Sequence, residues 1–106
     1  MTTVKELFEA MPASFKKESA AGMSTAIQFD ITGEGGGRWY AAIENGELTV
    51  AEGTHENPSL VIAAAAQDYI DIGTGKLNAQ LAFMTGRIRA TGDLRLAMKM
   101  PSIFKK

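Results

Sequence analysis

Apolar residues near the N-terminus recur every three or four places, a spacing typical of one face of an amphipathic helix. The positions in this stripe are Val4, Leu7, Phe8, Met11 and Phe15. Pro12 has no backbone N–H to donate, so we expect the helix that begins near Thr3 to break there and a short helix to follow over residues 13–20. The stripe favours core packing, and a cover over an apolar cavity by Phe8 or Phe15 is the alternative.

The apolar pattern then changes to a period of two, which predicts β-strands. Residues 23–31 alternate apolar and polar side chains, which predicts a half-buried strand with Gln28 among its solvent-facing positions. Two further strands are expected over 38–44 and 48–50, joined by Asn45-Gly46, because these residues favour the positive φ angles of a type I′ turn. These three strands would form an antiparallel meander, with a fourth strand over residues 60–64.

After the fourth strand the pattern predicts two short helices separated by turns. Residues 67–74 read as a helix that Gly73 or Gly75 can terminate in a left-handed conformation. Asn78 can cap the N-terminus of a second short helix over residues 79–84.

The last segment predicts one more strand and one more helix. Residues 86–91 read as a strand with basic flanks, and Asp93 can cap the helix that follows. Pro101 removes a hydrogen-bond donor, so we expect this helix to end or kink near Met100. Strands mixed with helices in one chain of 106 residues predict a single α+β domain over residues 1–106.

Composition and charge exclude several classes of function. The formal net charge is -1 and there is no cysteine, which argues against a nucleic-acid binder, a disulfide framework and thiol chemistry. No apolar run approaches the ~20 residues needed to span a bilayer. The N-terminus does not resemble a signal peptide and the C-terminus, Phe104-Lys105-Lys106, is not a Ser-Lys-Leu address. We therefore expect a cytoplasmic protein.

Candidate catalytic and metal-binding residues are few. The glycines of residues 33–37 precede a strand, so they predict a hairpin loop and no phosphate-binding loop. His55 stands alone in a polar loop, which favours an exposed, inert side chain and no metal site. Asp68 and Asp71 lie three apart on one helix face and are best explained as solvated. We therefore predict no catalytic residue, no metal and no cofactor.

Basic and methionine residues near the C-terminus leave two interpretations open. Arg87 and Arg89 share one face of the fifth strand, with Lys76 and Arg95 expected nearby. They could form a solvated edge that opposes aggregation, or they could meet an anionic headgroup at the mouth of a ligand site. Methionine adapts to irregular apolar shapes, so the methionines at 84, 98 and 100 indicate either ordinary core or an apolar cavity.

The same C-terminal residues resemble the sterol carrier protein 2 family. The resemblance is carried by Thr74-Gly75-Lys76-Leu77-Asn78-Ala79-Gln80-Leu81-Ala82-Phe83, by Gly86-Arg87-Ile88-Arg89-Ala90-Thr91-Gly92 and by Leu96-Ala97-Met98-Lys99. It implies a five-stranded, mostly antiparallel sheet with helices covering one face and an apolar tunnel between the layers. Ala79 replaces a family proline, and Met100-Pro101 replaces a common glutamine, which changes the end of the tunnel.

The resemblance implies non-catalytic lipid binding and transfer, with a fatty acid, fatty acyl-CoA, sterol-like molecule or other lipid in the tunnel. Its polar element would be Gln80. By family position, the residues near or lining the tunnel would be Trp39, Gln80, Phe83, Met84, Leu94 and Met98. The full set that we predict to bind ligand adds Phe29, Leu77, Leu81, Ile88, Ile103 and Phe104.

Two other functions stay open at this point. One is an accessory module that presents hydrophobic substrates to a partner enzyme. The other is a small isomerase-like enzyme, for which Asp30, Asp68, Asp71 and Tyr69 are the candidate acid–base residues. As partners we expect a small lipid and no nucleic acid, and a monomer or weak dimer without stable membrane insertion. Transient membrane contact is compatible with this sequence.

Overall fold

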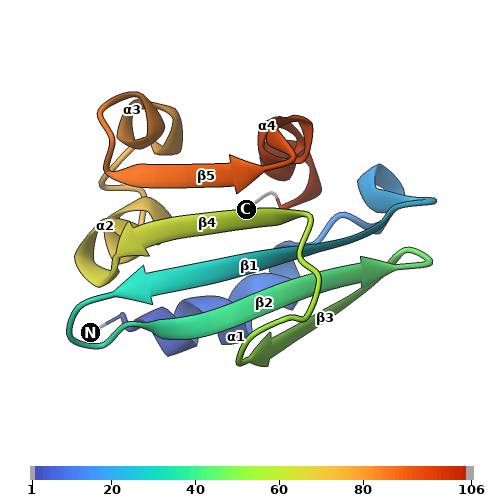
Figure 1. Ribbon diagram of the computed structural model, residues 1–106, viewed down its shortest axis with the longest axis horizontal. Helices are drawn as coiled ribbons and strands as arrows, with labels where there is room; N and C mark the ends of the chain where they lie inside the picture. Colours follow the sequence, from blue (N-terminus) through green and yellow to red (C-terminus); the bar gives the residue numbers. More distant parts are fainter. Residues whose placement is uncertain (1, 105–106) are drawn as a thin grey trace.

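The computed structural model describes residues 2–104, and its centre is a five-stranded sheet (Figure 1). The strands follow the spatial order β3-β2-β1-β4-β5, in which β1 and β4 are parallel and the other neighbours antiparallel. Their bounds are β1 Ser24–Thr32, β2 Gly37–Glu44, β3 Glu47–Glu52, β4 Leu60–Ala65 and β5 Ile88–Gly92. The predicted α+β class and mostly antiparallel sheet are confirmed.

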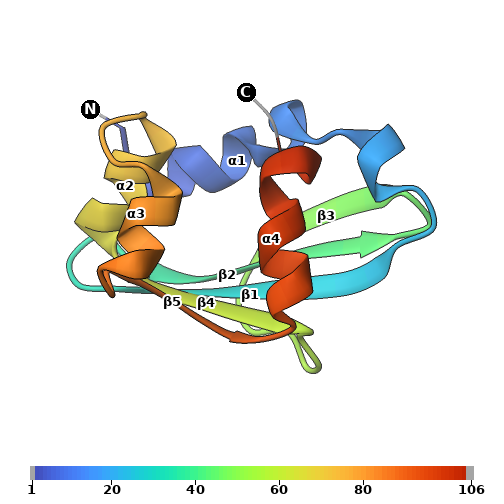
Figure 2. The same cartoon turned by 90° about the horizontal axis from the view of Figure 1, so that it is seen from above.

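The helices lie together on one face of this sheet (Figure 2). Their bounds are α1 Val4–Ser14, α2 Ala66–Gly73, α3 Ala79–Met84 and α4 Leu94–Ile103, with a 3₁₀ turn, η1, over Lys17–Ala20. Helix α1 lies over the β2 and β3 side of the sheet, whereas α3 and α4 stand at opposite ends of the edge strand β5 (Figures 1 and 2). The predicted single helical layer is therefore confirmed.

The predicted break of the first helix at Pro12 is wrong, and the last helix does not end near Met100, where a kink stays a prediction. Helix α1 continues through Pro12 to Ser14, and α4 continues through Pro101 to Ile103. Each proline sits close to the C-terminal end of its helix, and burial of Ile103, which is 1% exposed, favours the last turn of α4. The two helix ends meet, because the Lys16 backbone N–H donates to the Ile103 carbonyl over 2.6 Å. The short helix expected over 13–20 is reduced to the turn η1.

The predicted caps and turn are confirmed. The Thr3 hydroxyl accepts from the Glu6 backbone N–H, and the Glu6 carboxylate accepts from the Thr3 N–H, which makes a capping box. Side-chain oxygens also cap two of the other three helices, the Asn78 amide for α3 and the Asp93 carboxylate for α4. At the hairpin, Asn45 and Gly46 have φ angles of 53° and 76°, as a type I′ turn requires.

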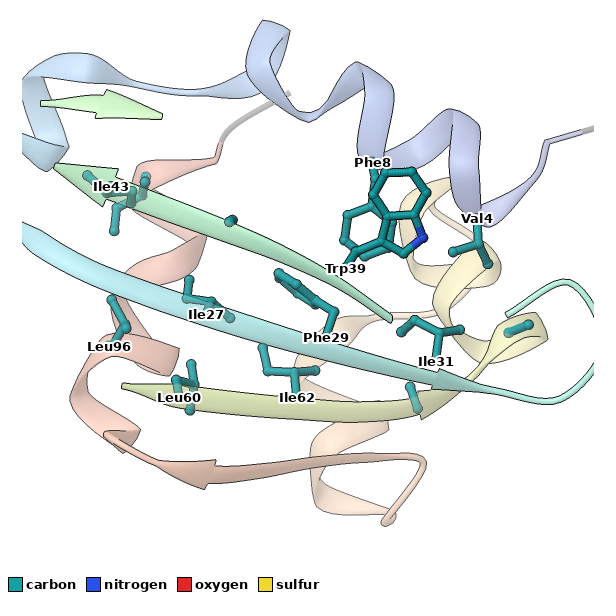
Figure 3. Close-up of a cluster of buried hydrophobic side chains, with 14 of the residues drawn as sticks. Val4, Phe8, Ile27, Phe29, Ile31, Trp39, Ile43, Leu60, Ile62 and Leu96 are labelled. Carbon is teal, nitrogen blue, oxygen red and sulfur yellow. The ribbon is translucent and has the colours of Figure 1, made fainter. Parts of the chain in front are cut away.

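The core fills the space between the sheet and the helices (Figure 3). Apolar side chains of β1, β2 and β4 point toward α1 and α4, and the register places Phe29 between Trp39 and Ile62. The labelled core residues in Figure 3 are Val4, Phe8, Ile27, Phe29, Ile31, Trp39, Ile43, Leu60, Ile62 and Leu96.

The opposite face of the sheet is crossed by the connection from β3 to β4 (Figure 1). Gln28 lies beneath this connection and is 3% exposed. Its amide nitrogen donates to the Trp39 and Gly53 carbonyls, each over 3.1 Å, and its oxygen accepts from the His55 backbone N–H over 2.7 Å. The prediction that Gln28 faces solvent is therefore wrong, because alternation does not reveal a loop that covers the second face.

His55 was expected to be exposed and is half-buried in this connection. Its ring packs edge-on against Tyr40 with 5.3 Å between the ring centroids. Its Nδ1 accepts from the Asn57 backbone N–H over 3.0 Å. The ring therefore has a packing role in the crossover connection.

Candidate functional site

Four aromatic rings meet between the helical layer and the sheet. The Phe8 ring of α1 is stacked between Trp39 of β2 and Tyr69 of α2, with 5.0 Å between ring centroids on each side. Phe29 of β1 meets Phe8 edge-on at 5.1 Å. Figure 3 shows the Phe8 and Trp39 rings face to face above Phe29. We call Phe8, Phe29, Trp39 and Tyr69 the aromatic stack.

Tyr69 carries the polar atom of the aromatic stack. Its side chain is half-buried and packs against Phe8 and Phe29. Burial raises the pKa of the Tyr69 phenol above its ordinary value, because the ionised form would lose hydration. The hydroxyl is therefore protonated at neutral pH and can donate a hydrogen bond, but it is a poor general base.

The carboxylates considered for acid–base chemistry have other partners. Asp30 forms an ion pair with Arg38 at 3.8 Å, and Asp68 forms one with Arg87 at 3.9 Å. Asp71 accepts a hydrogen bond from the Gln67 side-chain amide over 2.9 Å. Within residues 2–104, none of these three aspartates belongs to the hydrophobic core or is among the ring contacts of the aromatic stack.

Helices α3 and α4 form the outer part of the helical layer, over the edge strand. Helix α3 packs on β5, whereas α4 packs on both β4 and β5. Between them, Ile88 and Ala90 of β5 are half-buried and pack against the core. Ala90 pairs with Ile62 and Ile88 with Ala64 in the register, so these side chains share the face that the helices cover.

The two helices expose large apolar side chains. These are Leu81 at 57%, Phe83 at 51%, Met84 at 74%, Leu94 at 50% and Met98 at 81% of their full exposure. Within residues 2–104, every large apolar side chain found exposed lies on α3 or α4. Isolated exposed apolar residues are common, but a group confined to one part of a small domain indicates a contact surface. All five belong to the predicted ligand-binding set.

The rest of the predicted set lies in other surroundings. Phe29, Trp39 and Ile103 are buried core residues, whereas Leu77, Ile88 and Phe104 are half-buried. Gln80 is exposed in the first turn of α3, where its backbone N–H donates to the Asn78 cap. The structure therefore divides the twelve residues between the core, its margin and the outer helices.

Two cavities in the structure lie away from the aromatic stack, because no residue of the stack lines either of them. One of about 380 Å³ lies beside α4 and is lined by Met23, Ser24, Thr25, Ser59, Asp93, Arg95, Leu96 and Lys99. The other, of about 270 Å³, is lined by Ser24, Thr25, Ala26, Ala42, Ile43, Glu44, His55, Asn57 and Ser59. Neither includes a residue of α3, so the apolar tunnel stays a prediction.

Two residues of the aromatic stack were not in the predicted set. From the sequence, Phe8 was expected to belong to an apolar stripe or, as the alternative, to cover an apolar cavity, and Tyr69 was only a candidate acid–base residue. Their meeting depends on α1 and α2 packing side by side, a contact between segments far apart in the chain. Helical spacing identifies a buried face but not the residues that this face will touch.

Residues 2–104 contain neither a metal-binding cluster nor a membrane-spanning helix. No group of three or more His, Cys, Asp or Glu side chains in that range is placed to hold a metal ion. No helix in the described part of the chain has the length and apolar character needed to cross a membrane.

A family model described as the SCP-2 sterol transfer family matches residues 4–105. The chain therefore belongs to the SCP-2 sterol transfer family, a family of lipid-binding and lipid-transfer domains.

Relatives and solved structures agree with this assignment. Hydroxysteroid dehydrogenase-like protein 2 of Xenopus tropicalis is 30% identical over 101 residues, which are 94% of this chain and 24% of the relative. The chain thus spans about a quarter of that relative. The solution structure of palmitated SCP2L2 from Aedes aegypti has a TM-score of 0.80 at 22% identity, covering 96% of this chain and 94% of the other.

A third similarity is to part of a larger enzyme. The structure of the sec-alkylsulfatase Pisa1 from Pseudomonas sp. has a TM-score of 0.82 at 15% identity, covering 99% of this chain and 17% of the enzyme. At these identities the structural likenesses show the fold alone.

Proposed function

We propose that this protein is a non-catalytic lipid carrier that holds a hydrocarbon chain or ring system between its helical layer and its sheet. The observation that carries the proposal is the group of large apolar side chains exposed on α3 and α4, directly over the edge of the core. Membership of the SCP-2 sterol transfer family supports it. The ligand class is a fatty acid, a fatty acyl-CoA, a sterol-like molecule or another lipid.

The proposed binding region uses the predicted residues of the outer helices as walls. Leu81 and Phe83 of α3 and Leu94 of α4 would cover the ligand, and Ile88 of β5 would lie under it. The aromatic stack would close the inner end. Gly75 and Gly86, with φ angles of 83° and 80°, bracket α3 and allow tight turns on both sides of it. A short helix held between such turns can adjust its position over the sheet.

Burial of hydrocarbon supplies the driving force for this function. Each buried CH₂ contributes about 0.8 kcal/mol, so a sixteen-carbon chain could gain on the order of 10 kcal/mol before the costs of association. Polar recognition would be limited. The exposed Gln80 amide and the protonated Tyr69 hydroxyl are the groups we propose for a ligand oxygen.

The test is lipid capture by the purified protein. Native mass spectrometry of protein isolated from cells should show a bound lipid, and a fluorescent fatty acid should be displaced by unlabelled fatty acid. Trp39 is the chain's one tryptophan and stacks on Phe8, so its fluorescence should change on binding. Absence of co-purified lipid together with absence of probe binding would refute the proposal.

A second candidate function is suggested by the relatives. The chain corresponds to about a quarter of a protein named hydroxysteroid dehydrogenase-like protein 2. In that candidate function the domain presents hydrophobic substrates to a partner enzyme. Size-exclusion chromatography with candidate dehydrogenases, with and without lipid, would separate this function from free transfer. The cytoplasmic location and the monomeric or weakly dimeric state stay predictions of the sequence.

An isomerase-like activity is less well supported. It requires a base that faces the apolar ligand, and the three aspartates considered are paired elsewhere with Arg38, Arg87 and Gln67. The remaining candidate, Tyr69, keeps its proton at neutral pH. Binding without turnover is therefore the function we propose.

A further inference from the structure

We propose that the outer surface of α3 and α4 docks on an anionic lipid bilayer. The proposal begins with Met84 and Met98, which are 74% and 81% exposed. Each lies two positions after a buried residue of its own helix, Ala82 at 0% and Leu96 at 3%. Residues two apart on a helix point to nearly opposite sides, so both methionines point away from the core.

Basic side chains accompany both methionines. Arg87 follows Met84 by three positions, and Arg95 precedes Met98 by three, with Lys99 directly after it. All three basic residues are exposed, and Arg87 is also paired with Asp68 at 3.9 Å, so the test below uses Arg95 and Lys99. Apolar side chains next to Lys and Arg are the composition of interfacial helices, in which the apolar groups enter the acyl boundary and the cations meet lipid phosphates.

The distribution of charge along the chain supports an anionic partner. Residues 76–104 contain one acidic residue, Asp93, and five basic residues, which are Lys76, Arg87, Arg89, Arg95 and Lys99. Residues 2–75 contain eleven acidic and four basic residues. The net charge of -1 is therefore unevenly distributed along the chain, and the C-terminal end is strongly basic. This end contains all five exposed large apolar side chains found in residues 2–104.

A bilayer fits this surface better than a second copy of the chain. Two copies joined through the same surface would bring their basic residues together, which is unfavourable. The exposed groups are mainly aliphatic, spread over two helices at opposite ends of β5 (Figure 2). A fluid lipid surface can contact both helices at once without a matched shape. This docking rests on the proposed function, because it would place the outer helices against the membrane that supplies the lipid ligand.

The test is binding to vesicles of phosphatidylcholine with and without phosphatidylserine, measured by flotation. The wild-type protein should bind the phosphatidylserine vesicles more tightly. The double variant R95Q/K99Q should bind these about 25-fold more weakly, because each basic residue at an anionic surface contributes about fivefold. The matched control K16Q/K17Q removes the same charge from two exposed lysines outside the surface and should stay within about twofold of wild type.

A second variant tests the apolar contribution. M84Q/M98Q should weaken binding to both kinds of vesicle by about tenfold or more, because the methionines would no longer enter the acyl boundary. Thermal unfolding of each variant should match wild type, since the substituted side chains are exposed. Equal losses for R95Q/K99Q and K16Q/K17Q, or unchanged binding by M84Q/M98Q, would overturn the proposal.

The two proposals can fail separately. The fluorescent fatty acid is titrated into wild-type protein without vesicles. Probe binding without vesicle binding would overturn the docking surface alone and would indicate a protein partner for it. Vesicle binding without probe binding would overturn the proposed carrier function alone.

Discussion

Replacement of Phe8 by alanine should destabilise the protein more than replacement of an exposed apolar residue on the outer helices by alanine. Phe8 is 0% exposed and lies between the Trp39 and Tyr69 rings, with a third aromatic contact to Phe29. Alanine would remove the ring and leave a cavity at the centre of the aromatic stack. The sheet below and α2 beside it are held by other contacts, so the cavity can collapse only in part.

The expected magnitude follows from this geometry. A buried Phe→Ala change costs about 3–5 kcal/mol, and loss of the aromatic pairs places Phe8→Ala at the upper end. Phe83 provides a matched control, because it is the same residue type in a helix of the same layer but is 51% exposed. Full burial of a Phe side chain contributes about 1.5–3 kcal/mol, so Phe83→Ala should cost about 1 kcal/mol.

The assay is urea denaturation of delipidated protein, followed by circular dichroism. Wild type, Phe83→Ala and Phe8→Ala should have similar m-values and successively lower midpoints. If Phe8→Ala proves too unstable to purify, Phe8→Leu should fold and lie between the other two. Equal losses at positions 8 and 83 would refute the reasoning, because they would show that the aromatic stack contributes no more than a half-exposed ring.

Three further predictions concern the crossover connection, the aromatic stack and the ligand. Gln28→Leu should cost about 2 kcal/mol or more and speed hydrogen exchange at the His55 amide, because buried backbone groups lose their partner. Stability should fall as pH rises above about 10, where tyrosine ionises in the unfolded chain but Tyr69 stays protonated in the fold; Tyr69→Phe should flatten that fall. A saturating fatty acid at about one hundred times its Kd should add about 2.7 kcal/mol to the free energy of unfolding, and a constant melting temperature would contradict the proposed function.

Local rules predicted the N-terminal ends of the helices better than their C-terminal ends. The caps at Thr3, Asn78 and Asp93 were correct because a cap depends on residues within a few positions of one another. The break at Pro12 and the end of the last helix near Met100 were wrong because tertiary contacts decide the last turn. A buried Ile103 and the hydrogen bond from Lys16 to its carbonyl hold α4 beyond the proline.

Long-range packing explains what the sequence left undecided about the site. The apolar character of α3 and α4 and the basic residues in and around them could be seen in the sequence, and the structure shows that their large apolar residues are exposed. The partners of Phe8 could not be predicted, because Trp39 and Tyr69 come from elements 31 and 61 positions away in the chain. The burial of Gln28 could not be predicted for the same reason, because two of its hydrogen-bond partners lie in a connection that crosses the sheet.

The exposed apolar residues of α3 and α4 contribute little to folding, and this argues that they serve another contact. A helix needs only one buried face to pack, and Ala82 and Leu96 already provide that face. Polar residues at 84 and 98 would give the same packing with better hydration. Two contacts explain apolar residues there, one with a ligand held over β5 and one with the membrane that supplies it. Leu81 and Met84 are three positions apart and Leu94 and Met98 four, so the residues proposed as walls and those proposed to dock are neighbours on the same two helices and would share one apolar surface.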